Sequence, residues 1–124
     1  MKIFLTYTAL IEALTGLLLM LFPTKVVILL LQSPLEGNAS NVAAMLAGAA
    51  IFTTACASWI LKENPTARAG VKIMFVYNLL VTLLFIYSLI VFELKSTLLW
   101  LIIIFHSFQT FFSVFLLQKK EANK

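Results

Sequence analysis

The chain has 124 residues, of which 62% are hydrophobic and 11% charged, with a mean hydropathy of +1.04. This composition excludes a soluble globular domain and a nucleic-acid-binding module. The net charge of +4 therefore has to be explained within a membrane protein whose main partner is the lipid bilayer.

Four stretches are long and apolar enough to cross a bilayer, which takes about 20 residues for a hydrocarbon core of roughly 30 Å. We predict an all-α fold, a single domain over residues 1–124 whose four transmembrane helices form a bundle and span residues 3–22, 42–61, 71–92 and 97–118. The first stretch runs on through "LLLMLF" without a small-residue cleavage site, which favours a helix over a signal peptide.

The connection after the first helix differs from the other two. Pro23 ends or kinks the helix, and the following "TKVVILLLQ" is apolar but too short to span. We therefore predict a short interfacial helix at the outer surface or over the mouth of the bundle. Pro65 is expected to stop the second helix, and Ser96 or Thr97 is expected to cap the last one.

Basic residues are distributed unequally between the two ends of such a bundle. Only Lys25 and Lys95 fall on one side, and the others fall on the opposite side: Lys2, Lys62, Arg68, Lys72, Lys119, Lys120 and Lys124. Because cytoplasmic loops carry the excess of Lys and Arg, we predict a multi-pass protein with both termini in the cytoplasm.

Glu12 is an ionisable residue in the middle of the first apolar stretch. A charged side chain at the centre of a membrane helix costs about 2.5 to 3.5 kcal/mol on insertion scales, so its presence needs a reason. On an ideal helix Thr8, Thr15 and Gly16 share its face. We expect this face to point into the bundle, with Gly16 allowing another backbone to approach closely.

The third and fourth helices carry matching polar positions. By the rise of about 1.5 Å per residue, Glu12 and His106 both lie roughly 13 to 15 Å from a helix end, near the bilayer midplane. We predict a polar layer, if the faces converge, with a ligand or proton site formed by Glu12, His106, Asn78, Tyr77 and Gln109.

Such a site has several chemical uses. A close pair of Glu12 and His106 would titrate as a unit and could hold a proton, act as a general acid and base, or anchor the polar group of a lipophilic small molecule. The alternative for the hydroxyl side chains is a bond to their own helix backbone, which we expect for Thr8, Thr15, Thr82, Thr110 and Ser113.

The second helix contains no Asp, Glu, Lys, Arg or His, and we predict that its role is to pack against the other helices. Ala44, Gly48 and Ala55 form a face of small residues, and Cys56 is expected to be a small buried hydrophobe. Trp59 and Trp100 suit the two membrane interfaces. With one His and one Cys we predict no metal site and no resident cofactor; the alternatives are a quinone, or a haem held by two copies of His106 in a dimer.

A family resemblance rests on the order of several short features: Glu12, Gly16 and Pro23; "GAA" at residues 48–50 followed by Cys56 and Trp59; Tyr77 and Asn78; and Trp100 with His106. Together they resemble the small DoxX-like class of uncharacterised bacterial four-helix membrane proteins, from about residue 4 to residue 118. The resemblance implies a bundle in a bacterial inner (plasma) membrane with an inward polar site.

Other functions stay open from the sequence alone. "IEALTGLLLM" is similar to the first helix of small multidrug resistance transporters, whose central glutamate exchanges protons for cationic drugs. This chain departs from them in its first connection of about 20 residues and in a third helix without glycine. A third hypothesis is an accessory or scaffold subunit, which would bind a membrane protein or form a homo-oligomer. The sequence favours a binding protein over an enzyme.

Overall fold

The computed structural model describes residues 1–63 and 65–119, and these residues form helices and connections without a strand. The helices are α1 (Lys2–Leu21), α2 (Pro23–Leu31), α3 (Gly37–Leu61), α4 (Ala67–Val91) and α5 (Thr97–Lys119). All except α2 are long and apolar enough to cross a membrane. The chain is therefore an all-α, multi-pass membrane protein, as predicted.

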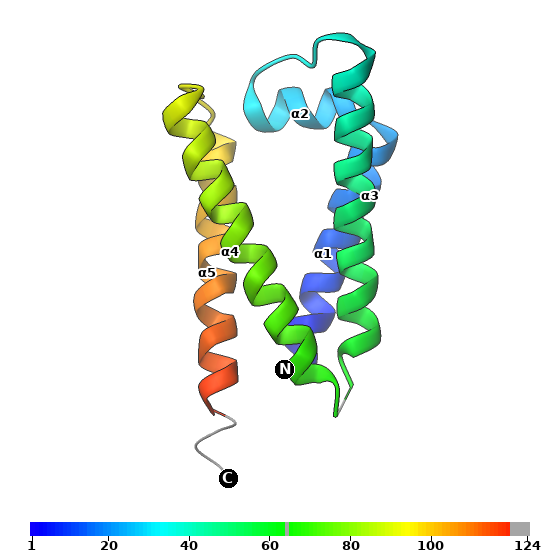
Figure 1. Ribbon diagram of the computed structural model, residues 1–124, viewed down its shortest axis with the longest axis vertical. Coiled ribbons are helices and arrows are strands. Elements are labelled where there is room, and N and C mark those ends of the chain that lie inside the picture. The colour runs from blue at the N-terminus through cyan, green and yellow to red at the C-terminus, as the bar shows by residue number, and fades with distance from the viewer. Residues whose placement is uncertain (64, 120–124) are drawn as a thin grey trace.

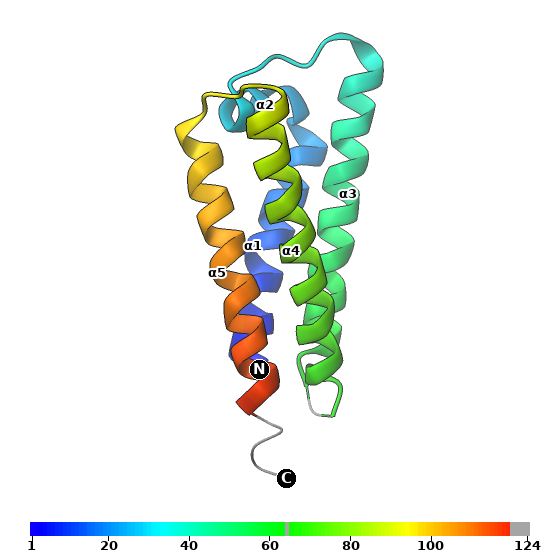
Figure 2. The ribbon, with the colours of Figure 1, turned by 60° about the vertical axis from the view of Figure 1, so that its left-hand side comes forward.

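The four long helices are arranged as two pairs. α1 packs mainly against α3, and α4 packs mainly against α5 (Figures 1 and 2). α1 begins and α5 ends at one end of the bundle, which we call the terminal end. The short helix α2 runs across the opposite end, called here the α2 end, where it contacts α1, α3 and α5. Of the two positions predicted for this segment, the outer surface or the mouth of the bundle, the structure shows the second.

The distribution of side chains is the reverse of that in a soluble protein. Large apolar residues of all four long helices point outward, for example Leu80, Phe108 and Phe111 at 60%, 65% and 75% exposure. The buried set is half polar: Thr8, Glu12, Ser58, Asn78, Thr82, Ser96, His106, Gln109 and Ser113. In water such an apolar surface would aggregate, whereas lipid solvates it. The apolar side chains can therefore face the membrane while the polar side chains lie in the interior.

Two glycines hold α1 and α3 together. A Cβ atom added to Gly16 would come within 2.6 Å of the Phe52 amide nitrogen and 2.7 Å of the Gly48 carbonyl oxygen. A Cβ on Gly48 would meet the Gly16 carbonyl oxygen and the Met20 amide nitrogen, both at 2.8 Å. The backbones thus touch where side chains are absent, and the close approach predicted at Gly16 is confirmed.

Two helices begin earlier than predicted. α3 starts at Gly37 rather than 42, since the polar residues before the apolar run are helical and bond their own backbone: Ser40 Oγ donates to the Gly37 carbonyl at 2.9 Å and Asn41 Nδ2 at 3.2 Å. α4 starts at Ala67 rather than 71. Its first amides bond back to the turn, from Ala67 to the Glu63 carbonyl and from Gly70 to the Thr66 carbonyl. Hydropathy marks where a span can begin, not where helical hydrogen bonding begins.

Ser96 connects the end of α2 to the start of α5. Its Oγ accepts a hydrogen bond from the Leu99 amide at 3.3 Å, as an N-cap does, and donates to the Leu30 carbonyl at 2.6 Å. Of the two predicted caps, Ser96 is the one used, and it also fixes where α2 crosses the bundle.

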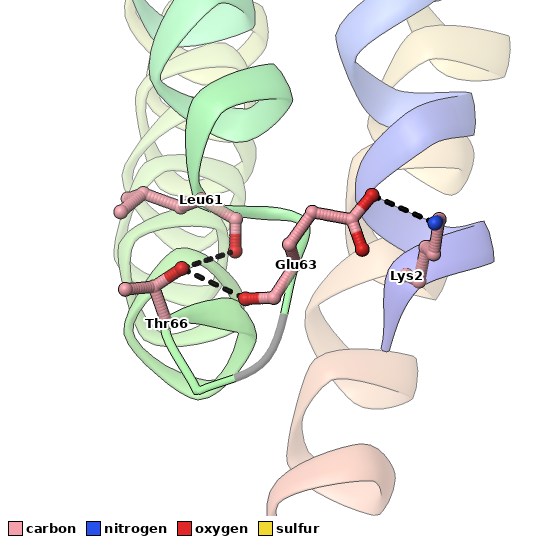
Figure 3. Close-up of polar contacts among 4 residues, drawn as sticks. All are labelled: Lys2, Leu61, Glu63 and Thr66. Carbon is pink, nitrogen blue, oxygen red and sulfur yellow. Dashed lines mark hydrogen bonds and ion pairs between the residues drawn. The ribbon is translucent and has the colours of Figure 1, made fainter.

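The turn between α3 and α4 lies beside the start of α1 at the terminal end. Lys2 Nζ forms an ion pair with Glu63 at 2.7 Å, and Thr66 Oγ1 donates to the carbonyls of Leu61 and Glu63 (Figure 3). Lys62, Arg68, Lys72 and Lys119 lie at the same end, and Lys25 and Lys95 at the other. Lys120 and Lys124, assigned to the same side from the sequence, lie outside the described residues.

Candidate functional site

Three side-chain hydrogen bonds link α1, α4 and α5 pairwise inside the bundle. Tyr77 joins α4 to α1, Thr8 joins α1 to α5, and His106 joins α5 to α4. The residues lie around the middle of their helices, about 13 to 15 Å from the helix ends for Glu12 by the helical rise. The predicted convergence of the polar faces of these three helices therefore occurs.

Glu12 is 2% exposed and is held by one partner. Tyr77 Oη donates to Glu12 Oε2 at 3.0 Å, while Oε1 is buried and has no hydrogen-bond partner among the described residues. A carboxylate can accept several hydrogen bonds, and a carboxylic acid can also donate one. Oε1 is therefore an unused acceptor or proton donor at the centre of the bundle.

Asn78 fixes the protonation pattern of the imidazole. Its Nδ2 donates to the Met74 carbonyl at 2.7 Å, which turns Oδ1 toward His106 as an acceptor. His106 Nδ1 lies 2.6 Å from that Oδ1, so Nδ1 must carry the hydrogen. In the neutral ring Nε2 is then the nitrogen that can accept a hydrogen bond.

Glu12 and His106 do not pair directly. Within residues 1–63 and 65–119 no ion pair or hydrogen bond joins them, and Tyr77 contacts both: it bonds Glu12, and its ring lies edge-on to the imidazole with centroids 6.0 Å apart. The hypothesis of a close Glu12–His106 pair is thus replaced by two separate pairs, Glu12 with Tyr77 and His106 with Asn78. The helices converge, but their rotation places the tyrosine between the two ionisable groups.

Gln109 adds a second unused polar atom. Its Oε1 accepts a hydrogen bond from Thr8 Oγ1 at 3.0 Å, while Nε2 is buried without a partner in the described part of the chain. The site therefore contains two polar groups without a partner among the described residues, the Gln109 amide nitrogen and the Glu12 carboxyl oxygen. Thr8, which bonds Gln109, lies one helical turn from Glu12.

The hydroxyl side chains divide as follows. Thr82, Thr110 and Ser113 donate to the carbonyls of residues 78, 106 and 109 at 2.8 Å, as expected. Thr8 bonds Gln109 instead, and Thr15 is exposed, so its predicted place on the inward face is wrong. Cys56 is also exposed rather than buried. Phe4 and Thr8, which flank the angular position of Thr15 on α1, are both buried, so Thr15 is left exposed by its position along the helix, nearer the α2 end.

One contact at this site is not predicted from the sequence. Ser58 Oγ of α3 donates to Met74 Sδ at 2.9 Å, one turn from Asn78, and so links the packing helix to the polar layer. Its signal was weak, because a serine in an alanine-rich helix looks like another small packing residue. No three of the His, Cys, Asp and Glu residues in the described ranges are grouped as metal ligands.

The chain was compared with known proteins. It matches no protein-family model, no curated protein and no solved structure. The function must therefore be argued from the site itself.

Proposed function

We propose that this protein is a small integral membrane binding protein that takes up a proton or a lipophilic small molecule with a polar group at the site around Glu12. The observation that supports this most strongly is Glu12 Oε1, a buried carboxyl oxygen at mid-bundle that has no hydrogen-bond partner in the part of the chain that the structure describes. A merely structural link between α1 and α4 would not need an ionisable group, because an amide or a hydroxyl would accept the Tyr77 hydrogen bond at lower cost.

The proposal also covers the orientation of the protein in its membrane, its family and the roles of the residues next to Glu12. The excess of Lys and Arg at the terminal end supports an orientation with both termini in the cytoplasm. The DoxX-like class, which the order of the sequence motifs resembles, is our proposal for the family, and this resemblance implies a bacterial inner membrane. In this function Tyr77 orients Glu12, and Asn78 orients His106 so that Nε2 is left to accept.

The test compares wild type with Glu12→Gln in lipid nanodiscs. Small molecules that co-purify are identified by mass spectrometry, and thermal stability is followed as a function of pH. We expect wild type to retain a specific non-lipid molecule, or to show an ionisation, that Glu12→Gln loses while its helical content is unchanged. A Glu12→Gln protein that retains the same molecules and the same pH profile as wild type would contradict the proposal.

Glu93→Gln is the matched control, because it removes the same charge from the α4–α5 connection outside the four long helices. It should leave both readouts at the wild-type level. If wild type shows a specific ligand, proton-coupled flux in vesicles then distinguishes transport from binding alone.

A further inference from the structure

α1 and α5 are neighbours that do not pack backbone to backbone. No Cα atom of α1 lies within 8 Å of a Cα atom of α5 in the described residues, although side chains reach across, with the Phe4 and Phe112 ring centroids 5.5 Å apart. Between the two helices lies a cavity of about 500 Å³, which we call the α1–α5 groove. Its lining includes Phe4 and Tyr7 of α1 and Phe105, Phe108, Gln109 and Phe112 of α5.

The groove has the size and shape of a site for an elongated apolar molecule. A volume of about 500 Å³ lies within the range of small-molecule sites, roughly 300 to 1,000 Å³. The groove extends from Phe105 near mid-bundle to Met1 and Leu116 near the terminal end, about 16 Å along α5 by the helical rise. Tyr7 and Phe108, exposed by 52% and 65%, stand at the bundle surface that faces lipid.

Gln109 and Tyr7 are the two residues of this lining that carry a polar side chain. Gln109 is 2% exposed, its Oε1 is occupied by Thr8, and its Nε2 has no partner within the described chain. A buried polar hydrogen without an acceptor costs about 1 to 3 kcal/mol, so an acceptor brought by a ligand gains affinity there. The hydrocarbon tail of a membrane lipid has no hydrogen-bond acceptor at this depth.

We propose that the α1–α5 groove admits, sideways from the bilayer, a lipophilic ligand that carries a carbonyl oxygen, and that this oxygen accepts a hydrogen bond from Gln109 Nε2. The proposal rests on the proposed function and deepens it, because it gives the chemical class of the ligand and its route toward the Glu12 turn. The aromatic side chains pack against the apolar body of the ligand, and the Gln109 amide donates a hydrogen bond to its carbonyl oxygen.

A matched pair of probes tests this directly. Decanophenone and decylbenzene differ in a carbonyl group in place of a methylene group. Each is titrated, as a mole fraction of lipid, into nanodiscs that contain the protein with ¹⁵N-labelled glutamine side chains, and the amide signals are followed by NMR. We expect decanophenone to bind about two- to tenfold more tightly, the factor that one hydrogen bond supplies, and to shift the Gln109 amide but not those of Gln32 and Gln118.

Three variants show which side chains cause the binding of the two probes. Gln109→Leu should abolish the preference for the ketone while it leaves decylbenzene binding in place. Phe108→Ala should weaken both probes, and Phe111→Ala, on the same helix but outside the groove and 75% exposed, should weaken neither. Because the comparison of the two probes needs only wild type, the test does not depend on the folding of any variant.

Equal binding of the two probes to wild type, or an unshifted Gln109 amide, would overturn the inference. It would also be overturned if neither probe bound and Phe108→Ala dissociated a dimer, because the groove would then be an interface between two copies. These results are independent of the Glu12→Gln comparison. If wild type shows no preference for the ketone but Glu12→Gln still loses the molecule that wild type retains, the groove proposal alone is rejected. If Glu12→Gln retains the same molecules and the same pH profile as wild type, the proposed function is rejected.

Discussion

At the scale of single residues, the hydrogen bond from Tyr77 to Glu12 is the link between α1 and α4 that the site depends on. The two side chains come from helices that otherwise meet at few points, and their atoms lie 3.0 Å apart in the middle of the bundle. Interhelical hydrogen bonds in membranes average about 0.6 kcal/mol, with a maximum near 1.7 kcal/mol.

A double-mutant cycle measures this link. Tyr77→Phe should destabilise the protein by about 0.6 to 1.7 kcal/mol in the wild-type background, because Glu12 then loses the one hydrogen-bond partner it has among the described residues, and by clearly less in a Glu12→Leu background. Unfolding in denaturing detergent gives the four free energies. Equal effects of Tyr77→Phe in both backgrounds would show that the hydroxyl does not act through Glu12.

At the scale of elements, α1 and α3 form a pair because two glycines let their backbones touch. Gly16→Ala would place a methyl group 2.6 Å from a backbone nitrogen, which cannot move without the helix. We expect a loss of about 1 to 3 kcal/mol or a displaced α3. In Gly70→Ala the nearest atom is Leu5 Cδ1 at 2.9 Å, the end of a flexible side chain, so the loss should be smaller. Thermal unfolding in detergent compares them, and the reverse ranking would contradict the packing described here.

At the junction of α2 with α5, one hydroxyl group forms hydrogen bonds to both helices. Ser96→Ala removes the cap of α5 and the bond to the Leu30 carbonyl, and should cost about 0.5 to 2 kcal/mol. Hydrogen exchange should rise in α2 as well as in the first turn of α5, since one side chain serves both. Thr97→Val is the control, because the Thr97 side chain is exposed. Faster exchange in α5 alone would show that α2 is held by its apolar contacts instead.

At the scale of the whole molecule, the positive charge at the terminal end predicts how the bundle lies in the membrane. In a Cys56→Ser background, Lys95→Cys at the α2 end should react with a membrane-impermeant maleimide added to intact cells. Lys62→Cys at the terminal end should react after the membrane is permeabilised. The opposite pattern would place the termini outside and contradict the proposed orientation.

Much of this architecture could be predicted from the sequence. Helix number, the short α2 and a cap at Ser96 or Thr97 follow from run length, proline positions and polar residues beside apolar runs, because the bilayer fixes how long a span must be. The early starts of α3 and α4 were missed, because polar residues can continue a helix beyond the hydrocarbon core.

The candidate site was only partly predictable for a different reason. Helical periodicity gave the faces that carry Glu12, Asn78 and His106, and their depth followed from the rise per residue. It did not give the rotation of one helix against another, which decides that Tyr77 rather than His106 meets Glu12 and that Thr8 meets Gln109. Run lengths and helical spacing are enough to place these polar groups within the membrane-spanning segments and to give their position along each helix. Which of them pair, and which stay unpaired among the described residues, is set by the fold, because pairing depends on the distances between helices and not on positions along one.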